Sequence, residues 1–129
     1  MIERIPIETL RAFCSSREID LTLVSPPQGY VVAFHGEYDG YGDFFTIAMR
    51  GVEYLDVAGG ITIGDLVLAS QVREVGELAL KWRGLGRRYS GSALAMRSAE
   101  ADAWGTASQD GMYLVVASEI VIMPGEDWK

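Results

Sequence analysis

The stretch HGEYDGYGDFF, residues 35–45, mixes carboxylates, glycines and aromatic rings. Three carboxylates within seven positions could supply hard oxygen ligands to a cation such as calcium. Aromatic faces beside acids also suit the apolar face and the hydroxyl groups of a sugar. The stretch is therefore a candidate binding site for a small molecule or a carbohydrate. Its candidate ligand-binding residues are His35, Glu37, Asp39, Tyr41 and Asp43.

A turn between two strands is the competing interpretation of this stretch. Aspartate and glycine are common turn formers, so their presence requires no ligand. The calcium-loop pattern D-x-[DN]-x-[DN]-G also fails when it is started at Asp39, because Tyr41 and Phe44 replace an acid and the glycine. Arg50 stands where that loop needs its bidentate acid. The turn is the favoured interpretation and the binding site is the alternative.

A basic cluster lies in the second half of the chain. Four of the eleven lysines and arginines fall within eight positions. Cationic groups so close together could bind an anion or an acidic surface on a partner protein. The alternative is a solvated strand end and loop, since charged side chains usually face water. The four residues are Lys81, Arg83, Arg87 and Arg88.

Nucleophile, metal and cofactor chemistry find little support in the sequence. The chain has one cysteine, Cys14, and one histidine, His35, whereas a zinc site usually takes about four such ligands. Cys14 lies on the apolar face of a predicted helix, where a free thiol behaves as a small hydrophobic group. Neither a Walker phosphate loop nor a dinucleotide-binding glycine motif occurs. We therefore predict a non-enzymatic protein with no catalytic residue, no metal and no cofactor.

The composition is that of one folded domain spanning residues 1–129. Hydrophobic residues make up 49% of the chain and charged residues 22%, which is enough for an apolar core. A net charge of −7 opposes binding to nucleic acid or to an anionic membrane, and could steer the protein toward a basic partner. We predict a cytoplasmic location for three reasons. The chain has a single cysteine and no recognisable secretion signal, and its apolar runs are far shorter than the ~20 residues of a membrane helix.

Hydrophobic periodicity predicts the elements that would position these residues. Residues 6–16 have the apolar spacing of a short helix, and Pro6 and Glu8 suit its first turn. Alternating apolar residues in 18–25 and 30–38, separated by a PPQG turn, indicate an antiparallel hairpin.

Further strands are expected later in the chain. Residues 44–57 have a strand pattern with a bulge or bend at Gly51, and residues 61–70 form another apolar segment. Residues 112–123 are the most apolar strand, so we expect them in the centre of a sheet.

Residues 66–83 are ambiguous between helix and strand. A helical spacing joins Leu68, Val72, Val75, Ala79 and Trp82. Leu78, Leu80 and Trp82 instead alternate with charged residues, as in a half-buried strand. We favour the strand for residues 77–83 and leave the earlier part open between a strand and a helical turn.

Local propensity predicts a second helix over residues 93–104. That segment is rich in alanine and follows Ser92, a good N-cap residue. Trp82 and Trp104 fall on faces that we expect to be buried. Trp128, in the polar tail, is either an exposed interface anchor or packed back on the domain.

These elements predict an α+β domain, mainly an antiparallel β-sheet or sandwich with one or two short helices. Its predicted function is that of a small acidic, non-enzymatic protein-interaction domain, for example an inhibitor or immunity-type protein. The alternative is a small-molecule or carbohydrate-binding β domain that uses residues 35–45. Strand edges also invite self-association, and the sequence does not choose between a monomer and a homo-oligomer.

Overall fold

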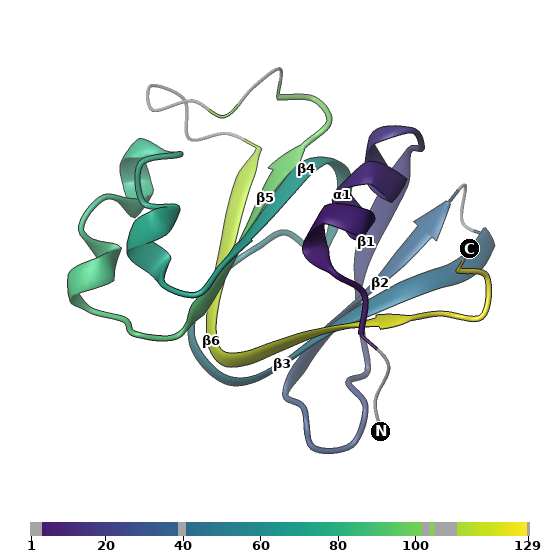
Figure 1. The fold of residues 1–129 in the computed structure, drawn as a ribbon, viewed down its shortest axis with the longest axis horizontal. Coiled ribbons are helices and arrows are strands. Elements are labelled where there is room, and N and C mark those ends of the chain that lie inside the picture. Colours follow the sequence, from purple (N-terminus) through teal and green to yellow (C-terminus); the bar gives the residue numbers. More distant parts are fainter. Residues whose placement is uncertain (1–3, 39–40, 102–103, 105–110, 129) are drawn as a thin grey trace.

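The computed structural model describes residues 4–38, 41–101, 104 and 111–128. Within them, six antiparallel strands close into a barrel in the order β1-β2-β3-β6-β5-β4 (Figure 1). The elements are α1 (Ile7–Ser15), β1 (Ile19–Val24), β2 (Val32–Tyr38), β3 (Tyr41–Asp56), β4 (Gly60–Ala69), the 3-10 helices η1 (Val72–Glu74), η2 (Leu80–Trp82) and η3 (Leu85–Arg87), β5 (Ser92–Ser98) and β6 (Met112–Pro124). The predicted antiparallel β domain with short helices is confirmed, and its sheet closes on itself where a sandwich would keep two separate sheets.

The two longest strands, β3 and β6, pair with each other over most of their length. They pair from Phe45 with Pro124 to Asp56 with Leu114, and they run side by side as a bent ribbon (Figure 1). Near the middle of β3, Gly51 has a φ of +62°, and the pairing with β6 shifts register just beyond it. The bend predicted at Gly51 is therefore confirmed, because glycine adopts this backbone conformation without steric cost.

The bend divides the sheet into two halves. The first half of β3 also pairs with β2, which pairs in turn with β1. The first half of β6 also pairs with β5, which pairs with β4. Residues 20–22 of β1 pair with residues 60–62 of β4 and close the ring. The hairpin predicted from 18–25 and 30–38 is confirmed as β1 and β2.

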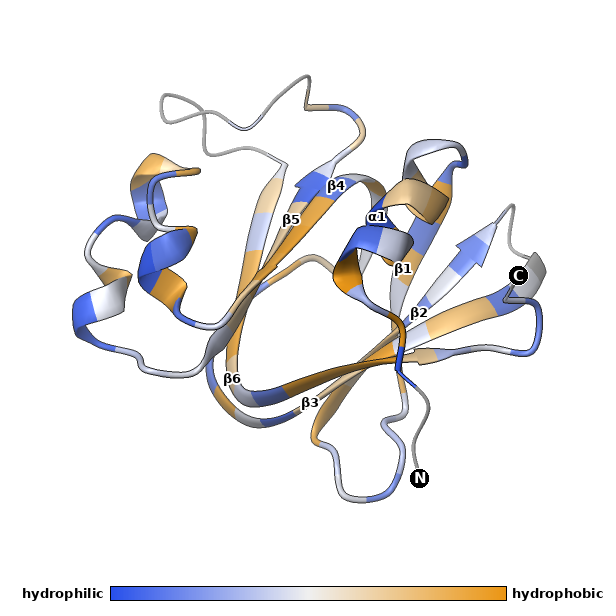
Figure 2. Cartoon of the chain, in the orientation of Figure 1, coloured by the Kyte–Doolittle hydropathy of each residue, from blue (hydrophilic) through white to orange (hydrophobic). Residues whose placement is uncertain are grey.

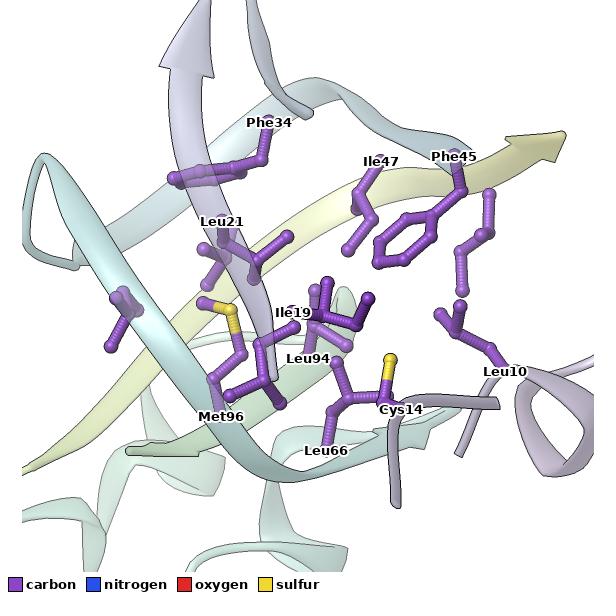
Figure 3. Packing of buried hydrophobic residues seen from close by; sticks show 14 of the residues in the cluster. Leu10, Cys14, Ile19, Leu21, Phe34, Phe45, Ile47, Leu66, Leu94 and Met96 are labelled. Carbon is purple, nitrogen blue, oxygen red and sulfur yellow. The ribbon is translucent and has the colours of Figure 1, made fainter. Parts of the chain in front are cut away.

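Apolar side chains from all six strands fill the barrel, as Figure 3 shows for part of the core. Helix α1 lies against the barrel and buries Leu10, Phe13 and Cys14 in this core. Gly36 of β2 leaves space for a neighbouring ring, because a Cβ atom there would lie 2.3 Å from Cζ of Phe45. Among the described residues, no helix combines the length and the apolar character needed to cross a membrane.

The three tryptophans are all partly or fully packed against the domain. Trp82 is fully buried, and Trp104 is half-buried with its ring centroid 6.2 Å from that of Trp82. Trp128 packs back on Phe13, with a centroid distance of 4.5 Å. Of the two interpretations of Trp128, the structure supports the packed one.

The helix predicted over residues 93–104 is wrong, because β5 (Ser92–Ser98) takes up the first half of that range and residues 99 and 100 form a turn. This strand lies between β4 and β6 and is buried on both faces. Leu94 and Met96 enter the barrel core, whereas Ala93 and Ala95 face a second apolar cluster outside the barrel. Burial on both faces of a sheet therefore overrides the helix propensity of alanine.

The strand predicted over residues 77–83 is also wrong. The chain there forms turns and η2, one of three successive 3-10 helices. A 3-10 helix has about three residues per turn, so apolar residues three apart share one face. The buried apolar side chains of this region are those of Val72, Val75, Ala79, Trp82 and Leu85. Leu80, which the strand pattern placed inside, is 47% exposed.

Candidate anion-binding site

Residues 70–91, which we call the 3-10 segment, link β4 to β5 and lie outside the barrel on its far side from α1 (Figure 1). Their apolar side chains pack against Ala93, Ala95 and other residues of β5 and β6. The carboxylate of Glu74 fixes the start of η1 by accepting a hydrogen bond from the backbone N–H of Gln71 at 3.2 Å. Figure 2 shows hydrophilic residues interspersed with apolar ones along this segment. The segment is therefore anchored through its apolar residues, with charged residues between them.

A cavity of about 350 Å³ opens among the 3-10 helices. Its volume falls in the range of about 300–1,000 Å³ that is typical of small-ligand sites. The lining combines three arginines with one glutamate, three glycines and a tryptophan. The lining residues are Arg73, Gly76, Glu77, Trp82, Arg83, Gly84, Gly86 and Arg87.

Positive charge dominates this lining. Nε of Arg83 lies 3.6 Å from Oε2 of Glu77, the one carboxylate that lines the cavity. Neither Arg73 nor Arg87 forms an ion pair with any residue in the described part of the chain. The three guanidinium groups and one carboxylate leave two net positive charges, in a chain whose net charge is −7. Such a lining attracts an anion.

Two glycines give the cavity its shape. Gly84 has a φ of +86° between η2 and η3, a backbone conformation that other residues rarely adopt. A Cβ atom at Gly86 would lie 2.7 Å from Cβ of Arg73, so the glycine allows η3 to approach η1 closely. A second hollow of about 230 Å³ shares Arg73 and Gly86 with the first. Arg73 therefore borders both openings of the segment.

Two of the four residues of the predicted basic cluster line the cavity. Arg83 and Arg87 do so. Nζ of Lys81 instead lies 3.1 Å from Oδ2 of Asp56, in an ion pair with β3. The guanidinium of Arg88 lies over the ring of the tyrosine that follows it, 5.6 Å from the centroid. Lys81 and Arg88 are therefore outside the lining, although they remain close to it in sequence.

The sequence prediction missed Arg73. This residue is ten positions before Arg83, and a strand over 77–83 would have carried the two arginines apart. The spacing of the buried apolar side chains, which is three residues except for the four from Val75 to Ala79, is the signal that could have found it. That spacing predicts tight turns, and tight turns bring residues ten positions apart back to the same surface.

Residues 35–45, the other predicted site, lie mostly in two paired strands. Residues 35–38 end β2 and residues 41–45 begin β3, with Tyr38 paired to Tyr41. This pairing agrees with the interpretation of the stretch as a hairpin. Asp39 and the side chain of Tyr41 lie outside the described residues.

The described candidates in this hairpin occupy separate environments. His35 and Glu37 alternate with Phe34 and Gly36, which face the core, so the first two point to the outer surface. The backbone N–H of Asp43 donates to the carboxylate of Asp127 at 3.0 Å. No group of three or more His, Cys, Asp or Glu side chains among the described residues is arranged to hold a metal ion. The small-molecule or carbohydrate site at 35–45 stays a prediction.

A second group of charged residues lies between α1 and the barrel, and its charges are paired. The carboxylate of Asp65 accepts hydrogen bonds from Nε and Nη2 of Arg11 at 3.0 and 3.1 Å. It also accepts from Nε1 of Trp104 at 3.0 Å and from the backbone N–H of Leu66 at 2.8 Å. We call these residues the Asp65 cluster. The cluster connects α1, β4 and the residues that follow β5.

Hydrogen bonding determines the titration of this cluster. Burial alone would raise the pKa of Asp65, but hydrogen bonds from Arg11 and Trp104 and the positive charge of Arg11 bring it below its ordinary value. The hydrogen bond to Asp65 likewise raises the pKa of Arg11. Both groups therefore stay charged at neutral pH. Nearby, burial raises the pKa of Cys14 to about 12, so this thiol is protonated at neutral pH.

Comparison of the chain with models of known protein families, with curated proteins and with solved structures found no match. The features of this chain that bear on its function are therefore its own residues, above all the arginine-lined cavity and the Asp65 cluster.

Proposed function

We propose that this protein is a non-enzymatic interaction domain that binds an acidic group of a partner protein in its arginine-lined cavity. The observation that supports the proposal most directly is that Arg73 and Arg87 border a cavity without an ion-pair partner among the described residues. Structural arginines are commonly paired, as Arg11 is here. Unpaired arginines around a concave surface are suited to receive a carboxylate or phosphate from outside.

The charge of the rest of the molecule supports this binding mode. A net charge of −7 repels an acidic partner from most of the surface, whereas the arginine-lined cavity attracts it. The partner would therefore approach in one preferred orientation, which is how charge complementarity contributes to specificity. Leu80, 47% exposed on η2, offers apolar contact area in the same segment. An inhibitor or immunity-type protein is one form that such a domain could take.

The proposed site of action is the cytoplasm or another reducing compartment. The single cysteine is free and buried, so the described fold contains no disulfide that an oxidising environment would have to form.

The test begins with partners that co-purify with the protein from its native host and that mass spectrometry finds in stoichiometric amount. Their affinity is then measured for the wild type, Arg87→Glu and Arg88→Glu. The two substitutions make the same charge change at adjacent positions, but only Arg87 lines the cavity. We expect Arg87→Glu to weaken binding by about tenfold or more and Arg88→Glu to weaken it much less.

Equal losses in the two variants would show that general surface charge, and not the cavity, attracts the partner. Unchanged affinity in Arg87→Glu would remove the cavity from the interface altogether.

A further inference from the structure

The charge of the cavity lining matches one class of anion better than others. Three guanidinium groups and the carboxylate of Glu77 leave two net positive charges. A phosphomonoester carries a charge of about −1.5 to −2 at neutral pH, whereas a carboxylate or a sulfate ester carries one negative charge. Resting on the function proposed above, we propose that the group bound in this cavity is a phosphomonoester. It is either a phosphorylated side chain of a partner protein or a small organic phosphate.

The positions of the three arginines also suit a tetrahedral group. Arg73 belongs to η1, Arg83 follows η2 and Arg87 ends η3, so the three arginines that line the cavity come from three separate turns. A phosphomonoester presents three terminal oxygens in different directions, and each can accept hydrogen bonds from a guanidinium fork. A carboxylate has two oxygens in one plane, and a single arginine can satisfy it. Three arginines around one cavity are therefore better matched to phosphate.

Glu77 determines how strongly a ligand must compete for the site. Its Oε2 lies 3.6 Å from Nε of Arg83, which is longer than the roughly 2.7–2.9 Å of a charge-assisted hydrogen bond. Its side chain is also 81% exposed, so the carboxylate can move into solvent when another anion arrives. An arriving anion therefore has to displace only a weakly held carboxylate, and this displacement costs the same for a dianion as for a monoanion.

Calorimetric titration of the wild-type protein with phenyl phosphate and phenyl sulfate tests the charge argument directly. The two ligands have nearly the same shape, but at pH 7.5 the phosphate is largely a dianion and the sulfate is a monoanion. At constant ionic strength we expect phenyl phosphate to bind about tenfold more tightly or better. Equal affinity for the two ligands, or no binding of phenyl phosphate, would overturn the proposal.

Variants then test whether the cavity is the binding site. Arg87→Gln should weaken phenyl phosphate binding by about tenfold to a hundredfold, because it removes a charged hydrogen-bond donor. Arg88→Gln, which changes the neighbouring residue outside the lining, should leave the affinity within about twofold. Glu77→Gln should strengthen binding of both ligands, and that of phenyl phosphate more, because it removes a negative charge that repels a dianion more strongly than a monoanion. Circular dichroism of each variant confirms that it is folded. Equal losses in the Arg87 and Arg88 variants would overturn the assignment to this cavity.

The source of the phosphate is resolved by two further titrations. A short glycine-flanked phosphoserine peptide that binds more tightly than phenyl phosphate would indicate a phosphorylated protein, and the reverse order would indicate a small organic phosphate. Both results support the phosphomonoester.

The two proposals can fail separately. If a co-purified partner depends on Arg87 but phenyl phosphate binds no better than phenyl sulfate, the phosphomonoester proposal is wrong while the interaction function stands. If phenyl phosphate binds as expected but no partner depends on Arg87, the interaction function fails and the phosphate site stands.

Discussion

Arg11 and Arg73 carry the same guanidinium group in two very different environments. Arg11 makes two hydrogen bonds to Asp65, at 3.0 and 3.1 Å, and Asp65 is only 20% exposed. Arg73 is exposed, borders two hollows and has no ion-pair partner among the described residues. The first arginine connects elements of the fold, whereas the second contributes an uncompensated charge to a concave surface. The Asp65 cluster therefore contributes to the stability of the fold, whereas the cavity is the place where we propose that an anion binds.

Trp82 lies between the cavity and the Asp65 cluster, and its replacement by alanine should have the largest effect on the free energy of unfolding. It is fully buried, lines the cavity, and packs 6.2 Å from Trp104, which donates a hydrogen bond to Asp65. Trp82→Ala should lower the free energy of unfolding by about 3–5 kcal/mol, the usual cost of removing a buried aromatic side chain. Urea denaturation measures this change.

Trp82→Phe is the matched control for that substitution. The Nε1 atom of Trp82 is buried with no hydrogen-bond partner among the described residues, so phenylalanine loses no hydrogen bond there. We expect Trp82→Phe to lower the free energy of unfolding clearly less than Trp82→Ala does, because most of the apolar volume is retained. Equal losses in the two variants would contradict the view that packing is the main contribution of Trp82.

Asp65→Ala tests the contribution of the Asp65 cluster to stability, and we expect the second largest loss in the free energy of unfolding from this variant. The substitution removes the acceptor of four hydrogen bonds and should cost about 1–3 kcal/mol. The loss is not larger because Arg11 is 37% exposed and can turn toward water. Glu77→Ala is the comparison within the cavity, where a carboxylate 81% exposed should contribute less than about 0.5 kcal/mol. Comparable losses at the two positions would remove the distinction between the regions.

The contribution of Asp65 to stability should depend on pH, and this change is smaller than the two described above. The pKa of Asp65 is lower in the folded protein than the ordinary value of about 3.9 that it has when unfolded. Its contribution to stability is therefore complete above about pH 4 and is lost as the pH falls through the folded pKa. The difference in unfolding free energy between wild type and Asp65→Asn should be constant from about pH 5 to 7 and should decrease below pH 4. A difference that stays the same at pH 3 would show that the carboxylate charge does not stabilise the fold.

The two regions also differ in how far the sequence predicted them. Period-two alternation located β1 and β2, and Gly51 marked the bend in β3, because these signals are local. The strand nature of β5 could not be predicted locally, because it arises from burial between β4 and β6. The cavity itself was not predicted: the sequence placed Arg83 and Arg87 in a basic cluster because they are close in sequence, whereas Arg73 reaches them through tight turns. The pairing of Arg11 with Asp65 joins residues 54 positions apart, and no local pattern predicts such a contact.

Removing the arginines of the cavity should have the smallest effect on stability. Arg73 and Arg87 have no ion-pair partner among the described residues, so replacing both with glutamine breaks no attractive charge pair. The double variant Arg73→Gln/Arg87→Gln should unfold within about 0.5 kcal/mol of the wild type. At low salt it should be slightly more stable, because two like charges near Arg83 are removed, and added salt should reduce that gain.

The matched comparison is Arg11→Gln, which removes one positive charge and the partner of Asp65, and which should destabilise the fold at every salt concentration tested. Denaturation of the three proteins in urea at two ionic strengths measures all of these differences. If the double variant lost as much stability as Arg11→Gln, then Arg73 and Arg87 would be structural residues. The protein would then hold no unpaired positive charge ready for an anion, because the charges of Arg73 and Arg87 would already stabilise the fold.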